Sequence, residues 1–375
     1  MRIAVDATAA RSLGHGIGTY VSGLLAELPA VESDNHYIAY LSGRASDRLA
    51  VCSQFSKRVS FRTVTAFRPL RVIWEQMVLP LEVSRLHCNV LWGCHNTLPA
   101  FKTTPQVVTV HDIGMLVLPQ YYPRSKVAYF RHAILAAVRQ ADIVVSVSEF
   151  TSLELQSRLG VPRKKIRVVQ NGVDAQFRPV NEPEKLERVR HALRLPDKFI
   201  LALGVPEPKK NLECLLRAFA TLRAQHAIEH KLVIGGARRL GWKNQRFYEL
   251  AQSLGDSVIL LDFVVQEDLP TLYTLADLFV FPSLYEGFGL PPLEAMSCGT
   301  PVVSSHSASL PEVLGDAAVL VDPKDERQLA EAILRVLSDS DLSSRLKERG
   351  RVNANRFSWQ RAAQSLTAVF KEVAA

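Results

Sequence analysis

The stretch YEGFGLPPLEAMSCGTPVVSS, residues 285–305, combines residue types that suit a phosphorylated ligand rich in hydroxyl groups. It follows an apolar run predicted to be a strand, and doubly wound parallel sheets bind ligands at the carboxyl ends of their strands. Gly287 and Gly289 let the backbone approach a ligand, and the two prolines that follow suit the first turn of a helix, whose amino terminus favours phosphate. Glu286 and Glu294 can accept hydrogen bonds from hydroxyl groups. A capped helix behind an ordinary glycine loop is the alternative interpretation.

The stretch LALGVPEPKKNLECLLRAF, residues 201–219, adds positive charge at the same predicted sheet edge. It begins with the first predicted strand of the second half, and Lys209 and Lys210 stand directly before a helix that Asn211 can cap. Their ammonium groups would meet phosphate charge. Two solvated surface lysines are the alternative.

In the first half, VVTVHDIG places His111 and Asp112 where a predicted strand ends. An earlier glycine loop, GHGIGTY, lies between the first predicted strand and helix, and its Gly16 and Gly18 allow close backbone approach. It is not a full dinucleotide-binding fingerprint, because Val21 occupies the position of the third glycine. A histidine at a strand end is more often structural than catalytic, so both interpretations of His111 stay open.

Two further patterns are typical of metal sites. HAIEH, residues 226–230, matches the HxxEH of some zinc proteases, but it runs from the end of a predicted helix into a strand. Asp339 and Asp341 form a DxD among serines before a helix, where capping is the better account. We therefore expect no metal site.

The elements that must position these residues alternate between short β-branched runs and helical periodicity, as in βαβ units. Helical stripes lie in residues 17–28, 125–139, 212–223 and 326–337, and a further amphipathic helix in 359–373. The predicted strands are residues 3–7, 89–93, 107–112 and 142–148, and then 199–204, 231–236, 258–264, 278–283, 301–305 and 318–321. Two Rossmann-like sheets in series account for this order.

A linker rich in proline and charge, residues 171–187, separates the two series. We place an N-terminal domain at residues 1–177, a C-terminal domain at 178–357 and a final helix at 358–375. The length of 375 residues, with 47% hydrophobic and 22% charged residues, agrees with two folded domains and excludes disorder and fibrous structures.

The apolar runs and the cysteines of the sequence indicate in which compartment of the cell the protein is expected. No apolar run reaches the roughly 18 residues of a membrane span, and Asp6 interrupts what would be the apolar part of a signal peptide. Five cysteines without CxxC spacing are expected to be reduced and mostly buried. We expect a cytoplasmic protein.

The charge of +8 is concentrated in the first half: residues 1–178 contain 21 Lys and Arg against 12 Asp and Glu. Such a surface suits a phosphate-bearing substrate or anionic lipid headgroups, or is simply solvated; nucleic acid ranks low because no nucleic-acid-binding motif accompanies the charge. We expect peripheral contact with an anionic membrane at the inner face of the cell membrane. The stretch FRPLRVIWEQMVLPL, residues 67–81, is a candidate for a membrane surface or a lipid-linked acceptor, and equally for a core helix.

The order of the motifs resembles family four of the retaining glycosyltransferases, whose fold is called GT-B, and in particular mannosyl and rhamnosyl transferases of cell-surface polysaccharide synthesis. The resemblance rests on GHGIGTY, HD after a strand, VSVSEFT, NGVD, PEPKKN, and EGFGLPPLE with seven residues between its glutamates. It implies two Rossmann-like domains that face a cleft, with the final helix crossing back to the first domain. It also implies a nucleotide-sugar donor held mainly by the second domain and an acceptor held mainly by the first.

The resemblance assigns roles to donor-site residues of the second half. Glu294 would hold the ribose hydroxyls and Glu286 those of the donor sugar, while Lys210 balances the diphosphate as it leaves. The backbone from Gly287 through Phe288 and Gly289 to Leu290 would meet sugar and phosphate. Similar enzymes often have an arginine where this chain has Val205, so Lys209 or another cation must compensate.

In the first half, the resemblance places His111, with the adjacent Asp112, beside the donor sugar, and Gly16 and Gly18 near the phosphates. The implied reaction is metal-independent, retaining hexosyl transfer without a cofactor. The expected donor is a GDP-sugar such as GDP-mannose, and the expected acceptor is a glycan, carried on a lipid. Two alternatives remain: an epimerase or hydrolase of nucleotide sugars on the same fold, and a non-catalytic nucleotide-sugar binding module.

Overall fold

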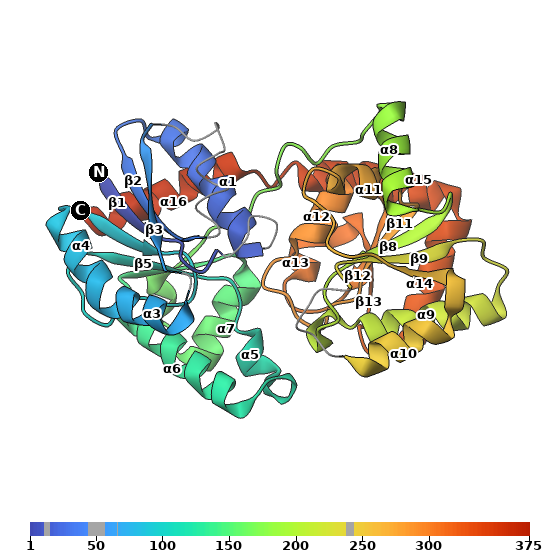
Figure 1. Cartoon of the computed structure of the whole chain (residues 1–375), viewed down its shortest axis with the longest axis horizontal. Coiled ribbons are helices and arrows are strands. Elements are labelled where there is room, and N and C mark those ends of the chain that lie inside the picture. Colours follow the sequence, from blue (N-terminus) through green and yellow to red (C-terminus); the bar gives the residue numbers. More distant parts are fainter. Residues whose placement is uncertain (11–15, 44–56, 66, 238–243) are drawn as a thin grey trace. The chain divides into compact units, whose positions relative to one another are not determined.

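The computed structural model describes residues 1–10, 16–43, 57–65, 67–237 and 244–375. They divide into two compact units, each with its own parallel sheet (Figure 1). The first unit consists of Met1–Gly172 and Phe357–Ala375, and the second of Val173–Arg356. Each unit is described by itself.

The first unit is built on a parallel sheet that has seven strands among the described residues, in the order β3-β2-β1-β4-β5-β6-β7. The strand order reverses beside β1, so that the neighbouring ends of β1 and β4 form the topological switch point. The strands are β1 (Arg2–Asp6), β2 (His36–Ser42), β3 (Val59–Val64), β4 (Val90–Gly93), β5 (Gln106–Val110), β6 (Ile143–Ser146) and β7 (Ile166–Val168).

Helices connect these strands, as parallel pairing requires. The longer ones bury apolar faces against the sheet; α6 and α7, for example, contribute Ile134 and Leu155 to a core with Val108 and Val144. The helices are α1 (Gly16–Val31), α3 (Arg68–Ile73), the π-helical η1 (Trp74–Val78), α4 (Leu79–Arg85), α5 (Gly114–Val117), η2 (Pro119–Tyr121), α6 (Arg124–Gln140), α7 (Glu149–Leu159), η3 (Arg163–Lys165) and, from the end of the chain, α16 (Trp359–Ala374).

Helix α16 packs along α1 in the first unit, where Figure 1 shows the red and blue helices side by side. Two glycines make room for Trp359 at its start: a Cβ on Gly23 would overlap the indole ring, and a Cβ on Gly172 would overlap the backbone of Trp359. Further along, Phe370 is buried and packs against Trp92, with ring centroids 5.7 Å apart. The expected return of the final helix to the first domain is confirmed.

The second unit repeats the plan with a parallel sheet of six strands among its described residues, in the order β10-β9-β8-β11-β12-β13. Its switch point lies between β8 and β11. The strands are β8 (Phe199–Leu203), β9 (Lys231–Gly235), β10 (Val258–Leu260), β11 (Leu278–Phe281), β12 (Val302–Ser305) and β13 (Val319–Val321).

A core of strand and helix side chains, among them Ile200, Phe219, Val280 and Ile333, holds this unit together. The helices are α8 (Pro183–Leu193), η4 (Pro208–Lys210), α9 (Leu212–Gln225), α10 (Gln245–Ser253), η5 (Gly255–Ser257), α11 (Leu269–Leu275), α12 (Leu290–Ser297), α13 (Leu310–Leu314), η6 (Gly315–Ala317), α14 (Glu326–Ser338) and α15 (Ser340–Ala354).

The predicted class of two Rossmann-like units is confirmed, and each strand predicted from the sequence is present. Three strands of the first unit, β2, β3 and β7, were not predicted; two of them, β3 and β7, are the edge strands. Cys88, Cys94, Cys214 and Cys298 are buried free thiols, as expected, whereas Cys52 lies outside the described residues. Within the described part of the chain, no helix is both long and apolar enough to cross a bilayer.

Candidate active site

The switch point of the second unit gathers the predicted donor-site residues. Gly204 follows β8 directly and has a φ of 154°, and the chain then forms η4, which ends at Lys210. The loop after β11 carries Glu286. A backbone hydrogen bond of 2.8 Å from the Leu284 N–H to the Lys209 carbonyl joins the two segments.

Lys210 and Glu286 form an ion pair across these segments, with 2.6 Å between Nζ and Oε1. Both side chains are largely buried, with 19% and 12% of their surfaces exposed. The ammonium group also lies 5.0 Å from the ring centroid of Phe281 at the end of β11, within reach of a cation–π interaction. The structure therefore brings together a cation and a carboxylate that are 76 residues apart in the sequence.

Ser309 fixes the glycine loop that carries Glu286. Its hydroxyl is buried and lies 2.9 Å from the Glu286 carbonyl and 3.0 Å from the Phe288 carbonyl. Ser307 adds a hydrogen bond of 2.7 Å to the Leu284 carbonyl. The loop is thus held at three carbonyls by serines that follow β12, the next strand of the sheet.

Gly289 occupies the N-cap position of α12 with a φ of 105°, in the left-handed region that glycine tolerates best. A Cβ there would lie 2.7 Å from Cδ2 of the fully buried Leu310. Helix α12 begins at Leu290, and because Pro291 and Pro292 of its first turn have no N–H, the N–H groups at this end are those of Gly289 and Leu290. Such a terminus carries partial positive charge and favours an anion.

Glu294 lies on α12 and is 8% exposed. The Tyr273 hydroxyl on α11 donates a hydrogen bond of 2.9 Å to its Oε2 atom. Burial is the main cause that raises the pKa of Glu294; the Tyr273 hydrogen bond lowers this pKa and the nearby Asp174 raises it, and the net value is about 7. This carboxyl therefore titrates near neutral pH.

A pH-dependent stability follows from Glu294. The pKa of Glu294 is about 7 in the folded chain, above the ordinary value of 4.5 that applies in the unfolded chain. Between these two pH values the folded chain therefore binds more protons than the unfolded chain. The free energy of unfolding consequently falls as pH rises from 4.5 to 7. The full effect is about 3 kcal/mol at 1.36 kcal/mol per pKa unit. We expect Glu294→Gln to unfold at higher urea than the wild type at pH 8, and the difference to shrink by pH 5. An equal difference at both pH values in urea melts would contradict the assignment.

In the first unit, His111 and Asp112 follow β5, as predicted. The His111 Nε2–H donates to the Cys94 carbonyl at 2.8 Å, and the ring meets the Tyr20 ring edge-on at a centroid distance of 4.7 Å. Burial lowers the pKa of His111, so its imidazole is neutral at pH 7. Asp112 accepts a hydrogen bond of 2.9 Å from the Gly114 N–H.

Gly16 and Gly18 lie in the first turn of α1 and not in a loop before it, which corrects their predicted setting. A Cβ on Gly16 would meet nothing within 4 Å, whereas Gly18 is buried. The segment 11–15 of the predicted glycine loop lies outside the described residues.

Three other motifs are now placed. Asn211 stands at the N-cap of α9 but its side chain does not cap the helix, which corrects the prediction; its amide instead donates to the carbonyls of Pro282 and Pro323 at 3.0 and 2.6 Å. Residues 226–230 follow the end of α9 and are not helical. Asp339 caps α15 by accepting from the Leu342 N–H at 2.8 Å, as predicted.

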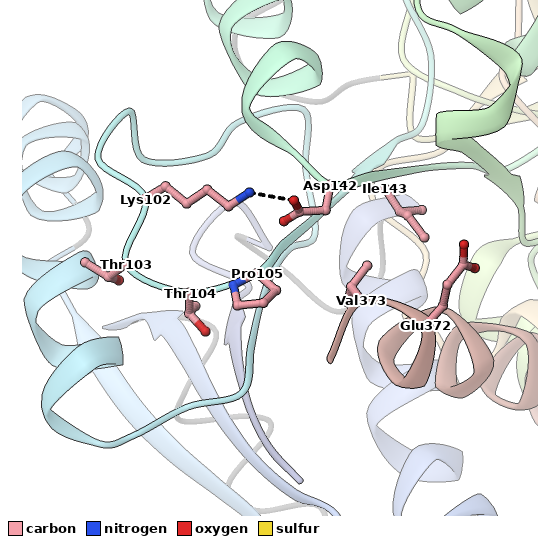
Figure 2. Close-up of a pocket in the computed structure, with 8 residues that line it drawn as sticks. All are labelled: Lys102, Thr103, Thr104, Pro105, Asp142, Ile143, Glu372 and Val373. Carbon is pink, nitrogen blue, oxygen red and sulfur yellow. Dashed lines mark hydrogen bonds and ion pairs between the residues drawn. The ribbon is translucent and has the colours of Figure 1, made fainter. Parts of the chain in front are cut away.

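A pocket of about 610 Å³ lies elsewhere, at the amino ends of β5 and β6 in the first unit. Figure 2 shows Lys102 directed at Asp142, with 2.6 Å between Nζ and Oδ1, and Glu372 of α16 nearby. The pocket lies at the opposite edge of the sheet from His111, so it is separate from the predicted site.

Comparison with known proteins identifies the family. The family model described as Glycosyltransferase Family 4 matches residues 14–177, and that described as Glycosyl transferases group 1 matches residues 183–353. O-antigen chain mannosyltransferase B of Escherichia coli is 34% identical over 256 residues, which are 68% of this chain and 67% of that protein. The chain belongs to glycosyltransferase family 4. This confirms the resemblance drawn from the motifs.

Another relative of this family-4 chain is the serotype-specific mannosyltransferase WbdA of Escherichia coli, 32% identical over 280 residues. These residues are 71% of the chain but only 33% of WbdA, so the chain spans about a third of that relative's length. Among solved structures, sucrose-phosphate synthase from Thermosynechococcus elongatus matches with a TM-score of 0.79 at 23% identity, covering 99% of this chain and 98% of that one. The family-4 chain therefore has the GT-B fold.

Several residues that contact the predicted site residues of each unit were not predicted. Tyr273 and Ser309 contact Glu294 and the glycine loop, yet neither belongs to a recognisable motif. In the first unit, Asn96 after β4 accepts from the His111 N–H at 3.3 Å, and it follows a second histidine, His95. The only sequence signals are polar residues directly after buried strands, as in SSHSAS and CHN.

Proposed function

We propose that the chain transfers a hexose from a nucleoside diphosphate sugar to a glycan and retains the configuration at the anomeric carbon. Membership of glycosyltransferase family 4 supports the reaction class. The observation that carries the proposal is the ion pair between Lys210 and Glu286, which places a cation and a hydroxyl-accepting carboxylate beside the amino terminus of α12.

The proposed donor is a GDP-sugar, with GDP-mannose as the first choice. Its support is the mannosyltransferase names of two relatives, which are 34% and 32% identical. Glu294 holds the ribose hydroxyls and Glu286 the hydroxyls of the sugar. Because a carboxylate accepts hydroxyl hydrogen bonds best when ionised, donor binding tightens as pH rises through the pKa of Glu294, about 7.

The reaction breaks the bond between the anomeric carbon and the oxygen of the diphosphate, and the electron pair leaves with that oxygen. Lys210 and the N–H groups at the start of α12 stabilise the negative charge that develops there. The acceptor hydroxyl attacks the same face of the sugar, and its proton passes to the departing phosphate. His111, neutral at pH 7, contributes a polar group beside the sugar.

We propose that no divalent metal ion and no cofactor take part, because two lysines and a helix terminus supply the positive charge. Val205 occupies the position where similar enzymes have an arginine, and we assign the compensating charge to Lys209, which precedes Lys210 in the same short helix, η4. The acceptor is a glycan carried on a lipid, which the O-antigen name of the 34% identical relative supports.

A thermal-shift panel of GDP, UDP, ADP, dTDP and NAD, each at one concentration and with EDTA, tests the donor class. A ligand at about 100 times its dissociation constant stabilises the folded state by roughly 2.7 kcal/mol. For a unit of this size we expect GDP to raise Tm by about 5–10 °C. A shift with UDP alone would overturn the choice of GDP, and a shift with NAD alone would overturn the proposed function.

Incubation with GDP-mannose separates transfer from the alternatives. Transfer requires a product that contains acceptor, with the anomeric configuration of the donor by NMR. Rapid release of free sugar or an epimerised donor without acceptor would favour a hydrolase or epimerase. Donor binding without turnover on a broad panel of lipid-linked glycans would favour a binding module.

A further inference from the structure

Tyr273 on α11 is a fully buried tyrosine of the second unit whose hydroxyl reaches the predicted donor site. Its ring packs edge-on against Phe177 and Phe279, with centroid distances of 6.0 and 5.3 Å. Its backbone carbonyl accepts a hydrogen bond of 2.6 Å from the buried Thr300 hydroxyl. Because three separate segments of the chain hold this residue, the position of its hydroxyl group is fixed.

The hydroxyl is directed at Glu294 of α12, the helix against which α11 packs (Figure 1). It donates to the Oε2 atom at 2.9 Å. Burial, together with the neighbouring carboxylate, raises the pKa of Tyr273 well above its ordinary value, so the hydroxyl keeps its proton and acts as the donor. Within the part of the chain that the structure describes, no group donates to the other oxygen, Oε1. This oxygen is left for a ligand.

The hydrogen bond also sets the orientation of the carboxylate. A glutamate on a helix does not by itself present its carboxylate in one plane, because its terminal torsion angle has broad preferences. The bond from Tyr273 fixes one of the two oxygens and therefore the direction in which the other one points.

The other groups around Glu294 do not take this role. Besides burial, Asp174 raises the pKa of Glu294, and Cys298 is a thiol whose own pKa is raised by burial and then by this carboxylate. Helix α15 packs on α12 through the uncharged Asn353, which contacts the side chain before it on that helix face. Among the described groups that face Glu294, Tyr273 is therefore the one that favours the ionised carboxylate.

We propose that Tyr273 is a positioning residue for the donor: its hydroxyl holds Oε2 of Glu294 so that Oε1 faces the ribose hydroxyls. The pair then makes the site select ribonucleotides, because a ligand without these hydroxyls leaves a largely buried carboxylate oxygen without a partner. In taking Glu294 as the group that binds the ribose, the inference rests on the proposed function.

Titration calorimetry at pH 8 with GDP and with 2′,3′-dideoxy-GDP, which lacks both ribose hydroxyls, tests the inference. The ratio of the two dissociation constants measures the contact with the ribose, because the base and the diphosphate are the same in both ligands. We expect the wild type to bind GDP about 10–100-fold more tightly, the range for a hydrogen bond to a charged group. Tyr273→Phe should reduce this ratio by about three- to tenfold and leave the affinity for 2′,3′-dideoxy-GDP unchanged.

Two further comparisons isolate the path through Glu294. In the Glu294→Gln background, which should itself lose most of the discrimination, Tyr273→Phe should change the ratio no further. In the wild type the ratio should rise with pH around a midpoint near 7, and in Tyr273→Phe the midpoint should lie about one pH unit higher, because the hydrogen bond lowers the pKa of Glu294.

Tyr37→Phe in the first unit is the matched control. It also removes a buried tyrosine hydroxyl, which accepts from the Asn35 amide at 3.3 Å. Its ratio and its pH midpoint should equal those of the wild type.

The possible failures are distinguishable. If the wild type binds both ligands equally, the assignment of Glu294 to the ribose fails, and the inference fails with it. If the wild type discriminates but Tyr273→Phe weakens the binding of both ligands by the same factor, the proposed function stands and Tyr273 only supports the fold. An unchanged ratio with an unshifted pH midpoint in Tyr273→Phe would also overturn the inference.

Discussion

Replacing Lys210 by methionine should lower kcat/KM for sugar transfer by about 10²–10³-fold, the loss seen when a group that stabilises developing negative charge is removed. The loss should fall mainly on kcat, because the charge on the diphosphate grows as the sugar bond breaks. Glu286→Gln should lose as much activity but also raise KM, because in the proposed function its carboxylate contacts sugar hydroxyls in the ground state. Steady-state kinetics with GDP-mannose and acceptor measure both effects.

Stability must be separated from activity here, since either change leaves one largely buried charge without its partner. The double variant Lys210→Met/Glu286→Gln removes both charges, so its urea midpoint should recover towards the wild type while its activity stays lost. Lys198→Met is the control: Lys198 pairs with Glu229 at 2.5 Å in the same unit but both side chains are mostly exposed. If the double variant regained turnover together with stability, the pair would be purely structural.

Gly289→Ala should reduce both donor affinity and stability. The new methyl group would lie 2.7 Å from Cδ2 of Leu310, and the residue would keep a φ of 105°, which side chains rarely adopt. The left-handed backbone and the overpacking together cost about 2–4 kcal/mol. If the loop shifts to relieve the overlap, the N–H groups that we propose to bind the phosphates move with it. We therefore expect GDP to bind at least tenfold more weakly.

Titration calorimetry with GDP and urea melts measure the two effects of Gly289→Ala. Gly255→Ala is the matched control in the same unit, because Gly255 also has a positive φ, 53°, but a Cβ there would meet nothing within 4 Å. It should lose a little stability and bind GDP like the wild type. Wild-type affinity in Gly289→Ala would show that the loop does not contact the donor.

The donor-site loop could be predicted because its signals are local. Gly287, Gly289 and the following prolines are neighbours in the sequence, and a strand before them fixes which edge of the sheet they reach. The pairing of Lys210 with Glu286 needed one further step, the parallel topology, which brings the ends of β8 and β11 together. The roles of these residues towards the donor stay predictions.

Residues whose partners are distant could not be predicted in the same way. Tyr273 reaches Glu294 only because α11 and α12 pack together, and a tyrosine in an apolar helix carries no sign of its hydroxyl's partner. Asn211 has the residue type and position of a helix cap, but the carbonyls of Pro282 and Pro323 compete for its amide. The local sequence pattern can show that a side chain is able to form a hydrogen bond, but tertiary packing determines which partner it bonds to.

The helical segment from α3 to α4 shows a third limit of prediction from the sequence. Its helical spacing was evident in residues 67–81, yet the same spacing is produced by a helix that packs into a core. The segment has apolar residues on both faces, so periodicity could not tell which face the sheet covers. The structure answers this by burying Leu79 and Val83 and leaving Ile73 and Met77 exposed.

The first unit draws its residues from both ends of the chain, and this sets an order during translation. The ribosome adds residues 357–375 after it has made the whole second unit, and only then can Trp359 and Phe370 fill their places against Tyr20 and Trp92. Synthesis that stops after residue 356 therefore releases a second unit with all its elements attached to a first unit whose core has a gap. The first unit therefore packs completely only in chains whose translation has continued beyond residue 356.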